Sequence, residues 1–344
     1  MSTSSPAPIP PRFQVSRMIS SLWVPQAIYA AARLRLPDVL AAGPLTGEEV
    51  AEKAGTHPGA TFRLLRSMVV LDLLSQDDAG RFALTETGRC LTEDAPDSVR
   101  SWALLWGGPM MWTHWGHLVD CVRTGDMAPK ILHGFETPFE LMARHPEDDA
   151  RFNRSMAELT RGVAMVLPGA YDFSGARLVC DVGGGFGQLL VPVLKAHPEL
   201  RGRVFDLASC ADGARDLMRE EGVADRCDFV AGDFFESVPE GADVYLIKSV
   251  IHDWNDDRSR EILSRCREAM SDDARLVVLE WIVPERVGPA DAGIVGTDLN
   301  MLVMVGGRER TEAEYRDLVA SAGLAVTRVI PTPAAMSLIE ARKA

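Results

Sequence analysis

The sequence of 344 residues has little that points to a secreted, metal-binding or membrane protein. Its cysteines occur singly, without the close spacing of a zinc site or a redox pair: Cys90, Cys121, Cys180, Cys210, Cys227 and Cys266. We therefore expect reduced thiols and a cytoplasmic location. No apolar run reaches about 18 residues, so we expect no membrane span. Residues 1–11 lack the charged and apolar regions of a signal peptide, and we expect an irregular tail there.

Basic residues are scarce relative to acidic ones. The chain has 36 Lys and Arg against 49 Asp and Glu, for a formal net charge of −13. Nucleic-acid binding needs a basic surface that contacts phosphates, so this balance argues against a nucleic-acid partner. The acidity identifies no partner by itself, because it also promotes solubility. The length is sufficient for two domains, each with its own core.

Residues 1–100 have the pattern of helices followed by a hairpin. Apolar residues recur at helical spacing from about residue 13 to residue 40. Thr46 is followed three residues later by Glu49, which predicts a capping box at the start of a short helix. A second helix is expected from Pro58, and residues 80–85 resemble a hairpin strand. Helix, helix and ribbon in this order predict a winged helix.

A winged helix raises the hypothesis of a DNA-binding regulator. Residues 1–100 contain ten basic and eleven acidic residues, and the second helix offers only Arg63 and Arg66 to a DNA groove. A reader of duplex DNA needs a basic stripe on that helix. We therefore favour a dimerisation domain at 1–100 and keep the regulator as a remote alternative.

Residues 101–165 are helical in pattern and rich in large apolar side chains. These are Trp102, Trp106, Met110, Met111, Trp112, Trp115, Met142 and Met156. At helical spacing such residues are typical of a core or a dimer interface, and they are also suited to an apolar ligand pocket. We interpret this region as a helical bridge that contributes to a substrate pocket.

Residues 166–344 alternate short β-branched runs with helical stretches. Strands are expected at 177–182, 203–205, 227–230, 243–247 and 275–280, with edge strands at 324–329 and 336–340. This alternation predicts an α/β fold: a Rossmann-like, doubly wound, mostly parallel sheet that follows an N-terminal α-helical winged-helix dimerisation domain.

The first of these strands runs into a glycine-rich turn at residues 181–188. Glycines permit a tight turn and a close approach of the backbone to a ligand. Asp206 ends the second strand, where a carboxylate can accept hydrogen bonds from both hydroxyls of a ribose. Gln188 stands where a dinucleotide site needs Gly or Ala. Asp181 would repel a pyrophosphate but suits the cationic amino end of S-adenosylmethionine, so we favour that cofactor over NAD.

Two further segments follow strands at the same edge of the predicted sheet. Asp233 ends the third strand, where it can bind an adenine amino group while Phe234 stacks on the ring; the alternative is a helix cap followed by core aromatics. The fourth strand leads to His252. Ligands bind beyond the carboxyl ends of strands in such sheets, so His252 is well placed as a general base.

A base is needed if the acceptor is a phenol, because a phenol has a pKa near about 10 and is protonated at neutral pH. The oxygen must lose its proton near the transition state of methyl transfer, and imidazole is matched to that task. Two acids are candidates for orienting His252, namely Glu280 at the end of the fifth strand and Glu309 in the segment 306–311. The sequence leaves open which of them does so.

These segments resemble the plant caffeate and flavonoid O-methyltransferases and their bacterial relatives from aromatic polyketide pathways. The resemblance covers nearly the whole chain and is carried by residues 181–185, 205–207, 232–235, 252–254 and 306–311. It implies donor contacts from Gly183, Gly185, Asp206, Leu207, Asp233, Phe234 and Lys248, besides Asp181. One departure is Ala208–Ser209, where the family has Pro–His.

The resemblance also implies the remaining roles. His252 is the expected base, Glu280 and Glu309 its acidic helpers, and the protein a homodimer that works without a metal. The expected acceptor contacts are Phe152, Asn153, Met156, Asp253, Asn300 and Met301. The predicted activity is methyl transfer from S-adenosylmethionine to a hydroxyl of a small phenolic or polyketide-type metabolite. A C-methyltransferase and a hydroxylase with the same fold remain alternatives.

Overall fold

The chain divides into two compact units, Met1–Trp112 and Thr113–Ala344. The boundary falls inside the range 101–165 that we interpreted as a bridge. This computed structural model describes residues 9–137, 140, 144 and 146–344, so most of the predicted tail and Met142 lie outside the described residues. Within those ranges, every helix is too short or too polar to cross a membrane.

The first unit consists of short helices and a two-stranded antiparallel ribbon. Its elements are α1 (Pro11–Ser20), α2 (Trp23–Arg33), α3 (Leu36–Leu40), α4 (Gly47–Ala54), α5 (Pro58–Val70), β1 (Leu74–Gln76), β2 (Phe82–Leu84), α6 (Glu86–Arg89) and α7 (Arg100–Trp106), while α8 (Pro109–Trp115) crosses the boundary. The predicted order of helix, helix and ribbon is observed in α4, α5 and the β1–β2 pair. The capping box is also present, because Thr46 accepts from Glu49 N while the Glu49 carboxylate accepts from Thr46 N.

Helix α1 is amphipathic, but none of its residues is buried. Phe13, Val15, Met18, Ile19 and Leu22 all leave between 48% and 71% of their surface exposed. Several large, exposed apolar side chains on one short segment are typical of a protein–protein interface.

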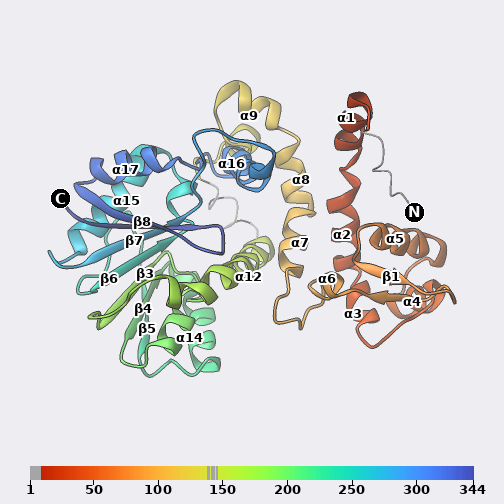
Figure 1. Cartoon of the computed structure of the whole chain (residues 1–344), viewed down its shortest axis with the longest axis horizontal. Helices are drawn as coiled ribbons and strands as arrows, with labels where there is room; N and C mark the ends of the chain where they lie inside the picture. The colour runs from red at the N-terminus through yellow and green to blue at the C-terminus, as the bar shows by residue number, and fades with distance from the viewer. Residues whose placement is uncertain (1–8, 138–139, 141–143, 145) are drawn as a thin grey trace, which may run out of the picture. The chain divides into compact units, whose positions relative to one another are not determined.

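The second unit is built on a seven-stranded sheet with the order β5-β4-β3-β6-β7-β9-β8 (Figure 1). The strands are β3 (Leu178–Val182), β4 (Arg201–Asp206), β5 (Cys227–Ala231), β6 (Val244–Lys248), β7 (Arg275–Glu280), β8 (Leu324–Pro331) and β9 (Ser337–Lys343). Strands β3 to β7 pair in parallel, and β9 runs antiparallel to both β7 and β8. The predicted mostly parallel sheet with its edge strands is confirmed.

The central strands β3, β6 and β7 are buried on both faces, since helices cover both. Val179 and Leu246 join a core with helices α12 to α14, whereas Cys180 and Ile247 join a second core with α15 and α17. The helices of this unit are α9 (Leu118–Thr124), α10 (Ala128–His133), α12 (Pro146–Ala170), α13 (Leu190–Ala196), α14 (Ala211–Glu220), α15 (Asp256–Ala269), α16 (Ala292–Met304) and α17 (Glu312–Ser321). Alternate residues of each strand therefore enter opposite cores.

The chain reverses its direction across the sheet at β3. Strands β4 and β6 lie on either side of β3, so the connections after β3 and β6 lead away in opposite directions. Such a switch point leaves a crevice at the carboxyl ends of the two strands, where ligands bind in open α/β sheets. The glycine-rich turn follows β3 and the His252 turn follows β6, which positions both segments at this crevice.

The central strands should carry most of the stability of the second unit. Leu246 is fully buried in β6, so Leu246→Ala should lower the free energy of unfolding by about 2–5 kcal/mol through lost burial and a cavity. The matched control Leu159→Ala removes a leucine that is 42% exposed on α12 and should cost about 0.5 kcal/mol. Urea unfolding followed by tryptophan fluorescence measures both; equal losses would contradict this packing.

Candidate active site

The glycine-rich turn is held by the neighbouring strand β4. Gly183 N donates to Phe205 O at 2.8 Å, and Gly185 N donates to the Asp206 carboxylate at 2.7 Å. Gly183 has φ +69°, and a Cβ there would lie 2.8 Å from a methyl group of Val250. The turn therefore requires glycine at this position, both for its backbone conformation and for the space beside it.

Asp206 has a second partner at the end of β4. Its carboxylate also accepts from Leu207 N at 2.6 Å. Burial raises the pKa of Asp206, while the two N–H donors act in the opposite direction. Asp206, which we predicted to bind the ribose, thus also holds the glycine-rich turn in place. Its position at the end of a strand did not predict this second role.

Asp181 is buried beneath the turn. It is 1% exposed, and among the described residues its Oδ2 has no hydrogen-bond partner. Burial raises the pKa of Asp181 to about 7, against the opposing effect of the Lys248 ammonium. A Cβ at Gly184 would lie 2.7 Å from this carboxylate, so glycine leaves room above it. An unpaired buried carboxylate is costly, and a cationic amino group of a ligand would relieve that cost.

Asp233 and Phe234 follow β5 at the same edge of the sheet. Asp233 Oδ1 accepts from Phe235 N at 2.8 Å, and the Phe234 ring lies edge-on to Phe235 with ring centres 4.9 Å apart. A Cβ on Gly183 would be 3.6 Å from the Phe234 ring. Asp233 is followed by a turn and not by a helix, so the helix-cap part of the alternative interpretation is wrong. Its aromatic packing is present, and Phe234 also adjoins the glycine-rich turn.

Glu280 holds the backbone of the turn that carries His252. This turn is a single 3-10 turn, Ile251–Asp253, after β6. Glu280 is fully buried at the end of β7, and its Oε1 accepts from the N–H groups of Val250, Ile251 and His252 at 3.1, 2.9 and 3.3 Å. One carboxylate oxygen therefore binds three consecutive backbone donors.

Glu309 is the acid closer to the imidazole. Its Oε1 lies 2.8 Å from His252 Nδ1, whereas Glu280 Oε2 lies 3.5 Å from the same atom. Asp298 accepts from Glu309 N at 2.8 Å and so holds the backbone of Glu309. His252 Nε2 lies on the other side of the ring, 3.5 Å from Asp253 Oδ1. The geometry thus distinguishes the two acids, with Glu280 on the backbone and Glu309 on the imidazole.

Arg310 supports the same turn, and sequence reasoning missed it. Its guanidinium has no exposed surface and donates to Ile251 O at 3.1 Å, Trp254 O at 2.9 Å and Asp256 Oδ1 at 2.8 Å. Gly307 packs on the turn so closely that a Cβ there would lie 1.9 Å from His252 O. Two neighbouring charged residues, Glu309 and Arg310, are therefore both buried. The only indication of this burial in the sequence is that both residues follow the two glycines at 306–307.

The carboxylates change the proton affinity of His252. Burial lowers the pKa of His252, but the negative charges of Glu280, Asp253 and Glu309 outweigh it and raise the pKa to about 10. Burial raises the pKa of Glu280, and it raises that of Asp253 to about 6. The cluster therefore retains protons at neutral pH.

The same cluster meets a loose geometric requirement for a metal site. Potential ligand atoms of His252, Glu280 and Glu309 lie within 4.8 Å of one another, although the sequence showed no ligand cluster. Nδ1 and Glu309 Oε1 are at hydrogen-bond distance, and Glu280 Oε1 already accepts from three N–H groups. We interpret the cluster as a hydrogen-bonded acid–base group.

The predicted acceptor residues lie on helices of the second unit. Phe152, Asn153 and Met156 are half-buried on α12, and Asn153 donates to Asp149 at 3.2 Å. On α16, Met301 is buried, and Asn300 Oδ1 accepts from the indole N–H of Trp115 at 3.1 Å. A contact with the imidazole at 3.5 Å and the charges of the cluster connect Asp253 with His252.

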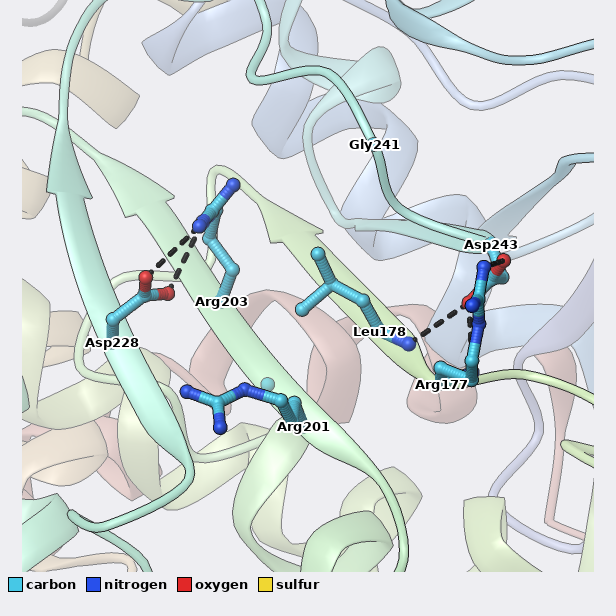
Figure 2. A pocket seen from close by; sticks show the side chains of 8 residues that line it. Arg177, Leu178, Arg201, Arg203, Asp228, Gly241 and Asp243 are labelled. Atoms are coloured by element: carbon cyan, nitrogen blue, oxygen red, sulfur yellow. Dashed lines mark hydrogen bonds and ion pairs between the residues drawn. The ribbon is translucent and has the colours of Figure 1, made fainter.

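A surface hollow of about 240 Å³ lies at the opposite edge of the sheet (Figure 2). Arg203 pairs there with Asp228 at 3.0 Å, and the backbone N–H of Leu178 donates to Asp243 at 3.0 Å. The hollow adjoins the amino ends of the strands, so it contributes nothing to the crevice.

Removing the charge of Glu309 should lower the pKa of His252. Glu309→Gln keeps an acceptor oxygen for Nδ1–H but loses the negative charge, so the imidazole should lose its proton at a pH lower by roughly 1–3. An NMR titration of the His252 ring nitrogens measures this, with the exposed Glu285→Gln as control. An unchanged titration in Glu309→Gln would contradict the electrostatic account.

Comparison with known proteins agrees with this architecture. Residues 16–94 match the O-methyltransferase dimerisation domain, and residues 115–325 match the O-methyltransferase domain. The chain is 38% identical over 326 residues to the phenazine O-methyltransferase PhzM of Lysobacter antibioticus, covering 95% of this chain and 94% of that protein.

Two further similarities concern ligands and activity. The crystal structure of the O-methyltransferase NcsB1 from neocarzinostatin biosynthesis, in complex with S-adenosylmethionine and 2-hydroxy-5-methyl naphthoic acid, superposes with a TM-score of 0.81 at 34% identity, covering 98% of this chain and 100% of that one. The aclacinomycin 10-hydroxylase RdmB of Streptomyces purpurascens is 36% identical over 340 residues, or 95% of this chain and 89% of that protein. The matched domains and the fold together show that the chain belongs to the family of S-adenosylmethionine-dependent O-methyltransferases that carry an N-terminal dimerisation domain.

Proposed function

We propose that His252 is the general base that removes the proton from an aromatic hydroxyl during methyl transfer. The observation that supports this most is the pair formed by His252 Nδ1 and Glu309 Oε1 at 2.8 Å. Because Glu309 engages Nδ1, the other ring nitrogen, Nε2, is left on the side of Asp253. A base with one nitrogen held by an acid and the other directed at the acceptor is the arrangement that proton removal needs.

The protonation state of His252 must then respond to the bound cofactor. An imidazolium cannot accept a proton, and the carboxylates hold His252 in that form up to high pH. A positive charge brought into the crevice opposes the imidazolium and lowers its pKa. When bound, S-adenosylmethionine supplies an activated methyl group. The proton of the acceptor hydroxyl would pass to Nε2. The new carbon–oxygen bond would form as the bond between the methyl carbon and the sulfonium sulfur breaks, and S-adenosylhomocysteine would leave with that electron pair.

The residues at the carboxyl edge of the sheet fit the cofactor group by group. Asp181, with its unpaired buried oxygen, would bind the amino group. Asp206 would bind the ribose, and Asp233 with Phe234 the adenine. Gly183, Gly185, Leu207 and Lys248 would complete this surface. Each of these residues follows or ends one of four parallel strands, β3 to β6.

The acceptor that we propose is a small aromatic metabolite of the phenolic or polyketide type. Phe152, Met156 and Met301 offer apolar contacts, and Asn153, Asn300 and Asp253 offer polar ones. The aromatic naphthoic acid in the NcsB1 complex supports this class. RdmB is a hydroxylase, so the mass of the product is the discriminating observation: methylation adds a CH₂ unit, whereas hydroxylation adds an oxygen atom.

We further propose a cytoplasmic homodimer with a dimerisation domain at 1–100, a helical bridge at 101–165 and a catalytic domain at 166–344. The match to a dimerisation domain and the exposed apolar side chains of α1 support self-association. All six cysteines are free, which suits a reducing compartment.

Replacement of His252 should separate catalysis from cofactor binding. His252→Ala removes the base and should lower kcat by about 10²–10⁴-fold, while the dissociation constant of S-adenosylhomocysteine stays unchanged because the glycine-rich turn is intact. Turnover of labelled donor with a panel of phenols, together with calorimetry, measures the two effects. A variant that turns over at the rate of the wild type would show that His252 is not the base.

A charge on α1 should disrupt the dimer. Ile19→Glu places a carboxylate on a residue that is 71% exposed in the isolated chain, and burying that charge at an interface is costly. We expect sedimentation to show half the mass of the wild type. Val119→Glu alters a residue of similar exposure, 66%, in the second unit and should leave the mass unchanged. A dimeric Ile19→Glu protein would place the interface elsewhere.

A further inference from the structure

Thr160 connects helix α12 with the end of strand β6. Its hydroxyl, which is buried on α12, accepts a hydrogen bond from Lys248 Nζ at 3.0 Å. The same hydroxyl donates to Met156 O at 2.6 Å. The ammonium, the hydroxyl and the carbonyl therefore form a chain of two hydrogen bonds from the end of β6 to one turn earlier in α12.

Thr160 lies where α12 changes its surroundings. Towards its carboxyl end, Val163, Ala164 and Leu167 pack in the core with at most 2% exposure. Towards its amino end, the helix carries the half-buried Phe152 and Met156. The hydrogen bond to Lys248 is therefore placed between the anchored part of the helix and the part that we propose to contact the acceptor.

A hydrogen-bond partner for the Lys248 ammonium offsets part of the cost of burying its charge. Burial lowers the pKa of its ammonium, while the negative charges of Glu280, Asp181 and Asp253 raise it. The ammonium thus interacts electrostatically both with Asp181, proposed to hold the donor, and with Asp253, proposed to contact the acceptor. An ammonium has three N–H donors, and the bond to Thr160 uses one of them. If donor binding reorients the other two N–H groups of Lys248, the ammonium rotates, and its hydrogen bond with Thr160 on α12 changes as well.

We propose that Thr160 is a positioning residue that couples occupancy of the donor site to the acceptor-side segment 152–156 of α12. This inference rests on the roles proposed above for Lys248 and for the α12 residues. Donor binding restricts the orientation of the Lys248 ammonium, which in turn orients the Thr160 hydroxyl. The hydroxyl then holds the carbonyl of Met156, one turn earlier in α12. Coupling of this kind is reciprocal, so a bound acceptor also tightens donor binding.

Hydrogen exchange of the full-length protein, with and without S-adenosylhomocysteine, tests the coupling. The product slows amide exchange in peptides that cover 150–160 in the wild type. Thr160→Val keeps the shape but removes the hydroxyl, so this ligand-dependent slowing is lost and the dissociation constant rises by about 5–10-fold. Thr160→Ser keeps the hydroxyl and restores both effects. A merely structural role would raise exchange in Thr160→Val without ligand and leave the ligand-dependent difference in place.

The outcomes separate this inference from the proposed function. If the wild type binds the product and Thr160→Val shows the same ligand-dependent slowing as the wild type, the coupling is wrong and the function stands. If calorimetry detects no binding to the wild type, the proposed donor site itself fails. Circular dichroism checks the fold of each variant, and Thr160→Ala provides a second hydroxyl deletion if the valine variant does not fold.

Discussion

The position of His252 depends on one buried carboxylate. Glu280 ends β7 with no exposed surface, and a single oxygen of its side chain accepts from three consecutive N–H groups of the His252 turn. Neighbouring parallel strands bring this acid and this turn together, because β6 and β7 end at the same edge. Glu309 then orients the imidazole, and Arg310 holds the carbonyl groups of the turn from below. The geometry of the His252 turn is thus a consequence of charge burial at the end of a sheet.

The burial of several charges also explains the electrostatics of the site. His252 and Lys248 are cations among the carboxylates of Asp181, Asp253, Glu280 and Glu309. Buried charges interact strongly, so each cation lowers the cost of burying the carboxylates and each carboxylate lowers that of the cations, whereas the carboxylates raise the pKa of one another. A cationic methyl donor belongs in such a surrounding, because the acids outnumber the bases. The same surplus of acids raises the pKa of His252 to about 10.

Sequence patterns predicted the fold and the edge of the sheet where the site lies. The central strands β3, β6 and β7 are apolar on both faces, which makes them recognisable as short runs. Each of the five parallel strands β3 to β7 ends in, or is followed by, a polar or glycine residue. The sequence could not decide between Glu280 and Glu309, because that choice depends on how the segment 306–310 packs under the His252 turn. Arg310 and Thr160 were missed for a similar reason. Their partners lie 59 and 88 residues away, and a buried arginine or threonine has no spacing signature.

The most direct test of the account is a crystal structure of the enzyme with S-adenosylhomocysteine and an acceptor identified by screening with labelled donor. The account predicts that the reactive oxygen of the acceptor lies about 2.6–3.2 Å from His252 Nε2, with Glu309 still bound to Nδ1. An acceptor oxygen turned away from His252, with no other path for its proton to that ring, would contradict the proposed base and require a different mechanism.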